Sequence, residues 1–119
     1  MRLIKSFGYA LAGVKYCFYH EKNFRMQLCI AAITFISGLY FRISSHEWLT
    51  ILFCSTLVLS LEMINTTIEK LSNEISQSIN PVIKQVKDVA AGAVLVSSII
   101  SFIVGIIIFL PKIKLLFLK

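Results

Sequence analysis

The residues best suited to chemistry form a polar series at the end of an apolar segment. Glu62, Asn65, Glu69 and Asn73 are separated by three, four and four residues, which places them on one face of an α-helix. The series follows directly on the apolar run 48–61, which is typical of a membrane span. A carboxylate near a bilayer centre costs roughly 2.5–3.5 kcal/mol on insertion scales. This cost indicates a functional role for Glu62.

Phosphoryl transfer is one reaction that such a series can serve. Two carboxylates at a membrane edge can hold Mg²⁺, which often uses few protein carboxylates together with phosphate oxygens. A lysine beside them, such as Lys87, can neutralise phosphate charge. Glu62 lies roughly 10 Å deeper than Glu69 at 1.5 Å per residue and can accept a proton from a lipid hydroxyl. No glycine-rich nucleotide motif is present, so spacing alone does not single out this reaction.

The composition indicates an integral membrane protein. Of 119 residues 57% are hydrophobic and the mean hydropathy is +0.82, more apolar surface than a soluble domain of this size can bury. The length predicts one domain, 1–119. The net charge is +6, but the basic residues flank apolar runs, so we expect contact with anionic lipid headgroups and no nucleic acid. The cysteines and histidines lack ligand spacing, so we expect no zinc site.

The hydrophobic pattern predicts an all-α protein with one surface helix and three membrane spans. The first segment is amphipathic and basic, which is typical of a helix lying in the membrane interface. Ser44–Glu47 has the S-x-x-E form of a capping box, and Asn80-Pro81 is a good helix start. Pro111 is expected to end the last helix. The surface helix is expected at about 2–19 and the spans at about 24–43, 47–69 and 88–110.

Two further patterns concern orientation and packing. Eight basic residues fall on the side of the N-terminus and the 70–88 loop, against four on the other, which predicts that the N-terminus and this loop are cytoplasmic. Small residues repeat every four positions on the last span, a pattern that lets helices approach closely in lipid, within one chain or between chains. They are Ala93, Ser97, Ser101 and Gly105.

Four motifs in order resemble the prokaryotic diacylglycerol kinase family, which includes undecaprenol kinases. Residues 62–69, EMINTTIE, resemble the family signature E-x-x-N-[ST]-[AT]-I-E. Residues 87–95, KDVAAGAVL, resemble its second motif, K-D-x-[AG]-[AS]-[AG]-A-V-L. Upstream, Phe7-Gly8-Tyr9 and Glu21-x-x-Phe24-Arg25 match the N-terminal pattern. The resemblance covers nearly the whole chain.

The resemblance implies an ATP- and Mg²⁺-dependent lipid kinase in the bacterial inner (cytoplasmic) membrane. It also implies a homotrimer with sites at subunit interfaces, where ATP enters from the cytoplasm and the lipid alcohol from the bilayer. Diacylglycerol is the favoured acceptor, and undecaprenol is the alternative. Asn73 departs from the family pattern, which usually has Asp there, and Ser78–Asn80 replaces a Glu-x-His element.

The same resemblance implies a role for each candidate site residue. Glu62 would be the general base on the lipid hydroxyl, and Asn65 would orient the reacting groups. Glu21 and Glu69 would bind Mg²⁺ bridging the ATP phosphates. Arg2 would also touch the lipid headgroup. The residues implied to contact or close over the nucleotide are Arg2, Tyr9, Lys87 and Asp88.

Two readings of other classes remain to be weighed. The carboxylates of Glu62 and Glu69 could form a proton or cation relay in a small transporter subunit. Such a relay needs a polar path across the whole bilayer, whereas the outer half of the second span is mainly apolar, with few polar residues such as Ser55, Thr56 and Ser60. The other reading is a purely structural assembly subunit, which leaves the carboxylates unexplained.

Overall fold

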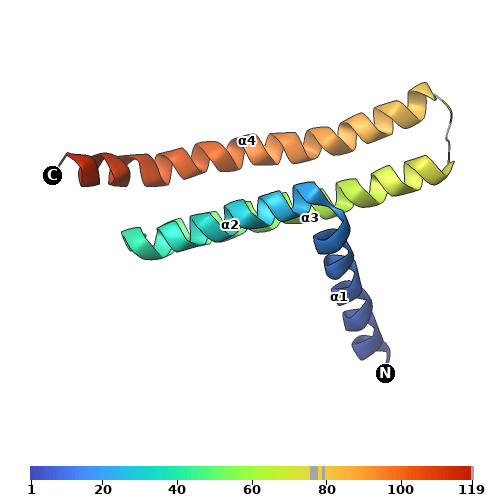
Figure 1. Cartoon of the computed structure of the whole chain (residues 1–119), viewed down its shortest axis with the longest axis horizontal. Coiled ribbons are helices and arrows are strands. Elements are labelled where there is room, and N and C mark those ends of the chain that lie inside the picture. Colours follow the sequence, from blue (N-terminus) through green and yellow to red (C-terminus); the bar gives the residue numbers. More distant parts are fainter. Residues whose placement is uncertain (76–77, 79, 119) are drawn as a thin grey trace.

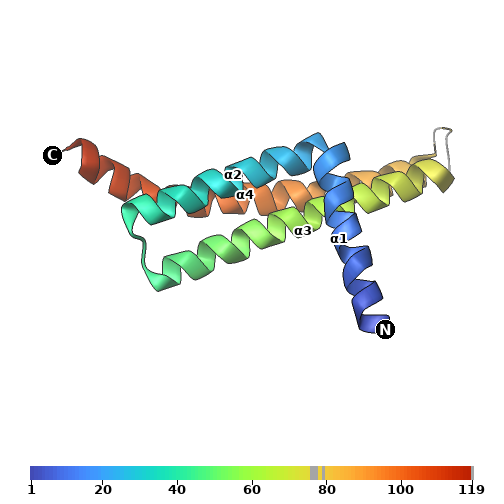
Figure 2. The same ribbon diagram turned by 60° about the horizontal axis from the view of Figure 1, so that its bottom comes forward.

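Four helices account for the regular structure of the described residues. The computed structural model describes residues 1–75, 78 and 80–118. Helices α2, α3 and α4 run alongside one another, whereas α1 runs across them and points away (Figures 1 and 2). The connection between α3 and α4 includes Ile79, so the Ser78–Asn80 departure lies partly outside the described residues. The helices are α1 (Arg2–His20), α2 (Lys22–Phe41), α3 (Ser45–Ile75) and α4 (Pro81–Phe117).

The prediction of an all-α membrane protein is confirmed. Helices α2, α3 and α4 are each long and apolar enough to cross a membrane. The 31 residues of α3 and 37 residues of α4 span about 46 and 55 Å at 1.5 Å per residue. Both therefore exceed a hydrocarbon core of about 30 Å. The expected 70–88 loop is thus mostly helical, because α3 continues to Ile75 and α4 begins at Pro81.

The two predicted helix starts are present. The backbone N–H of Glu47 donates to Ser44 Oγ at 3.2 Å, and the backbone N–H of Ser44 donates to Glu47 Oε1 at 3.0 Å, which is the reciprocal bonding of a capping box. Asn80 Oδ1 accepts from the backbone N–H groups of Val82 and Ile83. These bonds satisfy amides that have no partner within their own helix.

Pro111 does not end α4, contrary to expectation. The helix continues through it to Phe117, although proline removes one backbone donor and crowds the preceding turn. Lys112 lies beside it and donates from Nζ to the carbonyl of Ile108 at 3.3 Å and to Glu47 Oε2 at 2.9 Å. These bonds fix the turn around Pro111 against the start of α3 and favour continuation of the helix.

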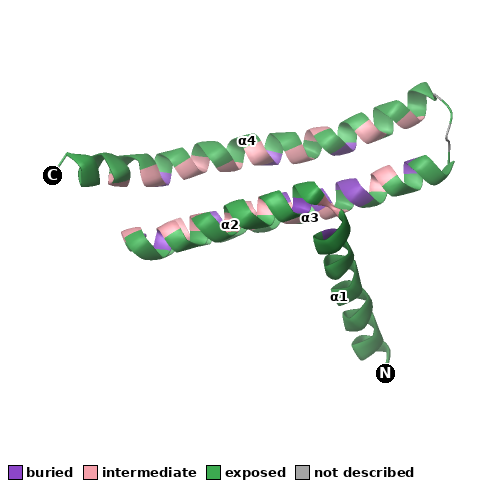
Figure 3. Cartoon of the chain, viewed as in Figure 1, coloured by how far each residue is buried: buried purple, intermediate pink, exposed green. Residues whose placement is uncertain are grey.

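Among the described residues, helix α3 carries more buried side chains than any other helix (Figure 3). Where α2 meets the start of α3, a Cβ on Gly38 would lie only 2.7 Å from the Trp48 ring, so this close approach requires glycine. On α4, Ser97 is buried, whereas Ala93 is exposed and a Cβ on Gly105 would meet nothing within 4 Å. Within the chain, the small-residue series therefore does not bring the backbones together at Gly105.

Candidate active site

The polar face of α3 changes from buried to exposed along its length. Glu62 is 4% exposed and Asn65 is 7% exposed, whereas Glu69 is half-buried and Asn73 is exposed. Asn65 Nδ2 donates to Glu69 Oε1 at 3.4 Å. The predicted stripe is therefore present as a continuous row that leads from the packed interior to the helix end.

Glu62 is buried, and its carboxylate has no hydrogen-bond or ion-pair partner among the described residues. No described side chain forms an ion pair or hydrogen bond with it, and only its backbone carbonyl accepts, from Thr66 Oγ1 at 3.0 Å. The charges that act on it come from Glu69, on the same helix, and from Glu21. A buried charge that is neither paired nor hydrogen-bonded is costly, so this position is unusual for a purely structural residue.

Glu21 forms the corner where α1 turns into α2. Its backbone is extended, with φ −113° and ψ 110°, so one residue ends α1 and starts α2. Arg25 Nη1 donates to the carbonyl of Phe18 at 2.9 Å across this corner, and Phe24 is buried beneath it. These contacts stabilise the corner between α1 and α2 at Glu21.

Cys17 provides independent evidence that the corner meets the polar stripe. It is buried on the last turns of α1. Burial raises the pKa of its thiol, and the charges of Glu21 and Glu62 raise this pKa further. One small side chain thus lies within electrostatic reach of carboxylates from two different segments, which brings the α1–α2 corner and the middle of α3 together.

The predicted nucleotide residues on α4 lie near the exposed end of the stripe. Lys87 Nζ donates to Asn73 Oδ1 at 2.9 Å. Asp88 pairs with Lys84 at 2.7 Å on an exposed surface. The first turns of α4 therefore bring Lys87 to the end of α3, next to Asn73, and carry the exposed Lys84–Asp88 pair on the same segment.

Arg2 and Tyr9 are not brought to this cluster. Both are exposed on α1, and Arg2 lies 19 residues before Glu21, which is about 28 Å along a helix. The end of α1 nearer Glu21 is instead tied to α3, because Lys70 Nζ donates to Tyr16 Oη and lies 4.8 Å from the centroid of its ring. Sequence analysis missed this tether, since a lone tyrosine and a lone lysine 54 positions apart give no pattern.

The donor set around Glu69 fits a hard cation. Asn65 Oδ1 is buried and has no hydrogen-bond partner among the described residues, and an amide oxygen beside carboxylates is a suitable ligand for Mg²⁺. Across the described part of the chain, no three His, Cys, Asp or Glu side chains form a metal cluster. Since Mg²⁺ typically keeps several waters and substrate phosphates, one or two carboxylates suffice.

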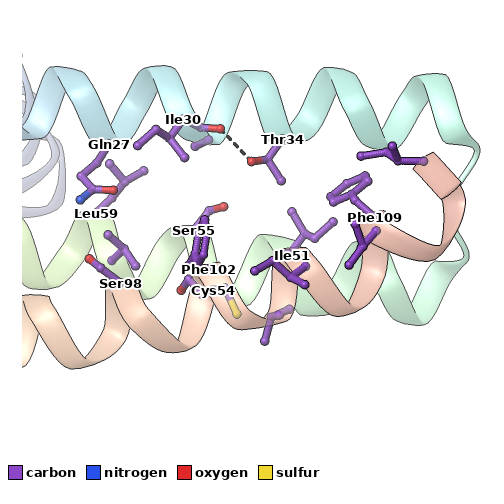
Figure 4. Close-up of a pocket in the computed structure, with 18 residues that line it drawn as sticks. Gln27, Ile30, Thr34, Ile51, Cys54, Ser55, Leu59, Ser98, Phe102 and Phe109 are labelled. Atoms are coloured by element: carbon purple, nitrogen blue, oxygen red, sulfur yellow. Dashed lines mark hydrogen bonds between the residues drawn. The ribbon is translucent and has the colours of Figure 1, made fainter. Parts of the chain in front are cut away.

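A cavity of about 420 Å³ lies between α2, α3 and α4 (Figure 4). It is lined mainly by apolar side chains, and it includes none of the predicted site residues. Its α3 lining contains Ile51, Ser55 and Val58, and the next position on that face is Glu62. The polar stripe therefore leads directly into this cavity, which we call the apolar groove. Its lining does not provide the continuous polar path that a proton or cation relay would need.

These features define a class of protein: a small polytopic membrane protein with a buried carboxylate at the junction of an apolar groove and a charged helix end. The family model for prokaryotic diacylglycerol kinase matches residues 8–109. The chain belongs to the prokaryotic diacylglycerol kinase family, and its class is that of lipid kinases. The resemblance drawn from four motifs is thereby confirmed.

Individual relatives support the same family. An undecaprenol kinase of Bacillus subtilis is 39% identical over 111 residues, which are 93% of this chain and 90% of that protein. A diacylglycerol kinase of Synechocystis is 39% identical over 112 residues, which are 92% of this chain but 63% of that protein. A diacylglycerol kinase of Helicobacter pylori is 29% identical over 98 residues, 82% of this chain and 77% of that protein.

Proposed function

We propose that this protein transfers the γ-phosphoryl group of ATP to the hydroxyl of a membrane lipid, with Glu62 as the general base. The observation that carries the proposal is Glu62, a 4%-exposed residue whose carboxylate has no partner among the described side chains and lies between an apolar groove and the charged ends of α3 and α4. A base in this position meets a hydroxyl at the membrane side of the site and phosphates at the other side.

The reaction is a direct displacement without a phosphoenzyme. The lipid oxygen forms a bond to the γ-phosphorus, the bond from this phosphorus to the β–γ bridging oxygen breaks, and ADP leaves. The hydroxyl proton passes to the Glu62 carboxylate and later to solvent. Because the γ-phosphoryl group itself is reactive once positioned, orientation and charge stabilisation supply most of the rate.

The remaining residues position the phosphates. Glu21 and Glu69 would hold a Mg²⁺ ion, which, when bound, neutralises charge on the ATP phosphates. Asn65, whose Nδ2 donates to Glu69, orients the reacting groups. Lys87 and Asp88 contact the nucleotide at the start of α4.

The homotrimer accounts for the two remote residues. A straight α1 keeps Arg2 and Tyr9 about 18–28 Å from Glu21 along the helix axis, so they act at the site of a neighbouring subunit, where they close over the nucleotide and Arg2 touches the lipid. We place the protein in the bacterial inner membrane, with the N-terminus and the 70–88 segment cytoplasmic. ATP then reaches the charged helix ends from the cytoplasm.

Two lipid alcohols are candidate acceptors. Diacylglycerol is the acceptor that we favour, and two of the relatives compared above are named for it. Undecaprenol is supported by a specific observation, because the undecaprenol kinase matches this chain over 90% of its own length. In either case the groove beyond Glu62 offers an apolar surface for the hydrocarbon next to the reacting hydroxyl.

The test is lipid phosphorylation by the purified protein in mixed micelles. ATP and Mg²⁺ are supplied with diacylglycerol or undecaprenol in separate reactions, and the product is identified by mass spectrometry. We expect phosphorylated lipid with one acceptor strongly preferred, and no product with Glu62→Gln. A folded, assembled wild-type protein that phosphorylates neither lipid would overturn the proposal.

A further inference from the structure

The contact between Asn73 and Lys87 joins the last turn of α3 to the second turn of α4. Lys87 Nζ donates to Asn73 Oδ1 at 2.9 Å. The lysine is half-buried and the asparagine is exposed. Asn73 lies one helical turn after Glu69 on the same face of α3, so this bond holds an ammonium group near the carboxylate predicted to bind the metal.

The charge on Lys87 is not balanced by a protein carboxylate. Asp88, its neighbour, pairs with Lys84 at 2.7 Å, and Glu47 pairs with Lys112 at the far end of the bundle. Among the described residues, which include every Asp and Glu side chain, none lies within ion-pair distance of Lys87. Its hydrogen-bond acceptor is a neutral amide, which fixes the ammonium group but cancels none of its charge.

We propose that Asn73 is a positioning residue that holds Lys87 in place while leaving its full positive charge for the nucleotide phosphates. The inference rests on the proposed function and deepens it, because it assigns a role to a residue outside the predicted catalytic set. An acidic side chain here would hold the lysine equally well but would compete with the phosphates for its charge. A short aliphatic side chain would leave the charge of Lys87 unchanged but would not hold its ammonium group in place.

Two substitutions separate position from charge. Asn73→Ala removes the acceptor, and Asn73→Asp keeps an oxygen in the same place but adds a negative charge. Gln85→Ala, on an exposed face of the same segment of α4, is the matched control. Steady-state rates are measured against MgATP at saturating lipid and at several salt concentrations, with detergent-solubilised assembly checked by size-exclusion chromatography.

We expect Asn73→Ala to raise KM for MgATP about 2- to 10-fold, the range for losing one hydrogen bond, with the wild-type dependence on salt. Asn73→Asp should raise KM as well, but with kcat retained and a shallower dependence of kcat/KM on salt, since screening acts on net charge. Gln85→Ala should match the wild type.

Wild-type turnover with unchanged KM in both Asn73 variants would overturn the positioning role and leave the kinase assignment standing. Equal rises in KM with the same salt dependence would overturn the claim that the neutrality of Asn73 matters. Absence of turnover in the wild type itself, with both lipids, would instead remove the proposed function on which the inference rests.

Discussion

The two ends of α3 treat their polar groups in opposite ways. At the Trp48 end, Glu47 accepts from the Ser44 backbone at 3.0 Å and pairs with Lys112 at 2.9 Å. The half of α3 that runs from Glu62 to Asn73 is called the Asn73 end. Here Glu62 is more deeply buried than Glu47 yet has no partner among the described side chains. Asn65 has a free buried oxygen and only a 3.4 Å bond to Glu69.

This difference distinguishes polar groups that stabilise the fold from polar groups that are available to a ligand. Buried polar groups that stabilise a fold are hydrogen-bonded, because an unmet group costs about 1–3 kcal/mol. The Trp48 end follows this rule, and its polar groups stabilise the helix start and the helix pair. At the Asn73 end, Glu62 and Asn65 lie on adjacent turns and keep buried oxygens that lack hydrogen bonds from the described residues. This arrangement is expected where a ligand completes the bonding. The following predictions test this contrast, from the largest expected effect to the smallest.

Neutralising one glutamate at each end should affect different properties. Glu62→Gln should lower kcat about 10²- to 10⁴-fold, the usual contribution of a general base, with stability unchanged or raised because an unpaired buried charge is removed. Glu47→Gln should leave kcat near the wild-type value and lower the free energy of unfolding only slightly, since it breaks a partly exposed ion pair.

The measurements are lipid phosphorylation and unfolding in mixed micelles titrated with denaturing detergent. The two variants are controls for each other, since both replace one carboxylate on the same helix. If Glu62→Gln retained near-normal turnover, or if the two variants lost activity equally, the distinction between the two ends would fail.

Removing the second carboxylate of the Asn73 end should affect metal dependence. Glu69→Gln takes away a proposed Mg²⁺ ligand and leaves an amide that Asn65 can still contact. We expect the Mg²⁺ concentration for half-maximal activity to rise about 10- to 100-fold, the scale of losing one contact between charged groups. The measurement is activity against total Mg²⁺ at fixed ATP. Unchanged metal dependence with reduced kcat would argue against metal binding by Glu69.

Much of this contrast is readable from the sequence. Spacing alone places Glu62, Asn65 and Glu69 on one face, and the S-x-x-E pattern locates the start of α3, because both depend only on local helix geometry. The family resemblance adds Glu21 and Lys87, which no local pattern could connect with α3.

Other features depend on tertiary packing that sequence patterns do not encode. Proline usually ends a helix because it lacks a backbone donor, so Pro111 is expected to end α4. The helix nevertheless continues, and Lys112 donates hydrogen bonds to Ile108 and Glu47 beside it. The Tyr16–Lys70 tether and the cavity beyond Glu62 need the relative positions of three helices. The direction of α1, which carries Arg2 and Tyr9 away from Glu62, is likewise set by the corner at Glu21.

Close packing at the Trp48 end can be tested with a pair of glycines. In Gly38→Ala, the new methyl group would lie 2.7 Å from the Trp48 ring and 3.0 Å from Ile43 Cδ1. We expect a loss of about 1–3 kcal/mol in the free energy of unfolding, as for other overpacked sites, with kcat per folded protein little changed. Gly105→Ala, where the methyl group meets nothing within 4 Å, should change stability by less than about 0.5 kcal/mol. Equal stability of the two variants would contradict the packing of this end.

The electrostatics of the Asn73 end can be read from the reactivity of Cys17, in a background with Cys29 and Cys54 replaced by alanine. Because burial and the charges of Glu21 and Glu62 raise the pKa of this thiol, its thiolate fraction at neutral pH is low. Labelling by a maleimide should be slow and should keep increasing with pH beyond the usual thiol pKa of about 8.5. Glu21→Gln removes one of the charges that raise the pKa of the Cys17 thiol, so the labelling rate at pH 7.5 should increase. Glu47→Gln, at the other end of α3, should leave the labelling rate unchanged. If both variants behaved alike, Cys17 would not sense the carboxylates that distinguish the two ends.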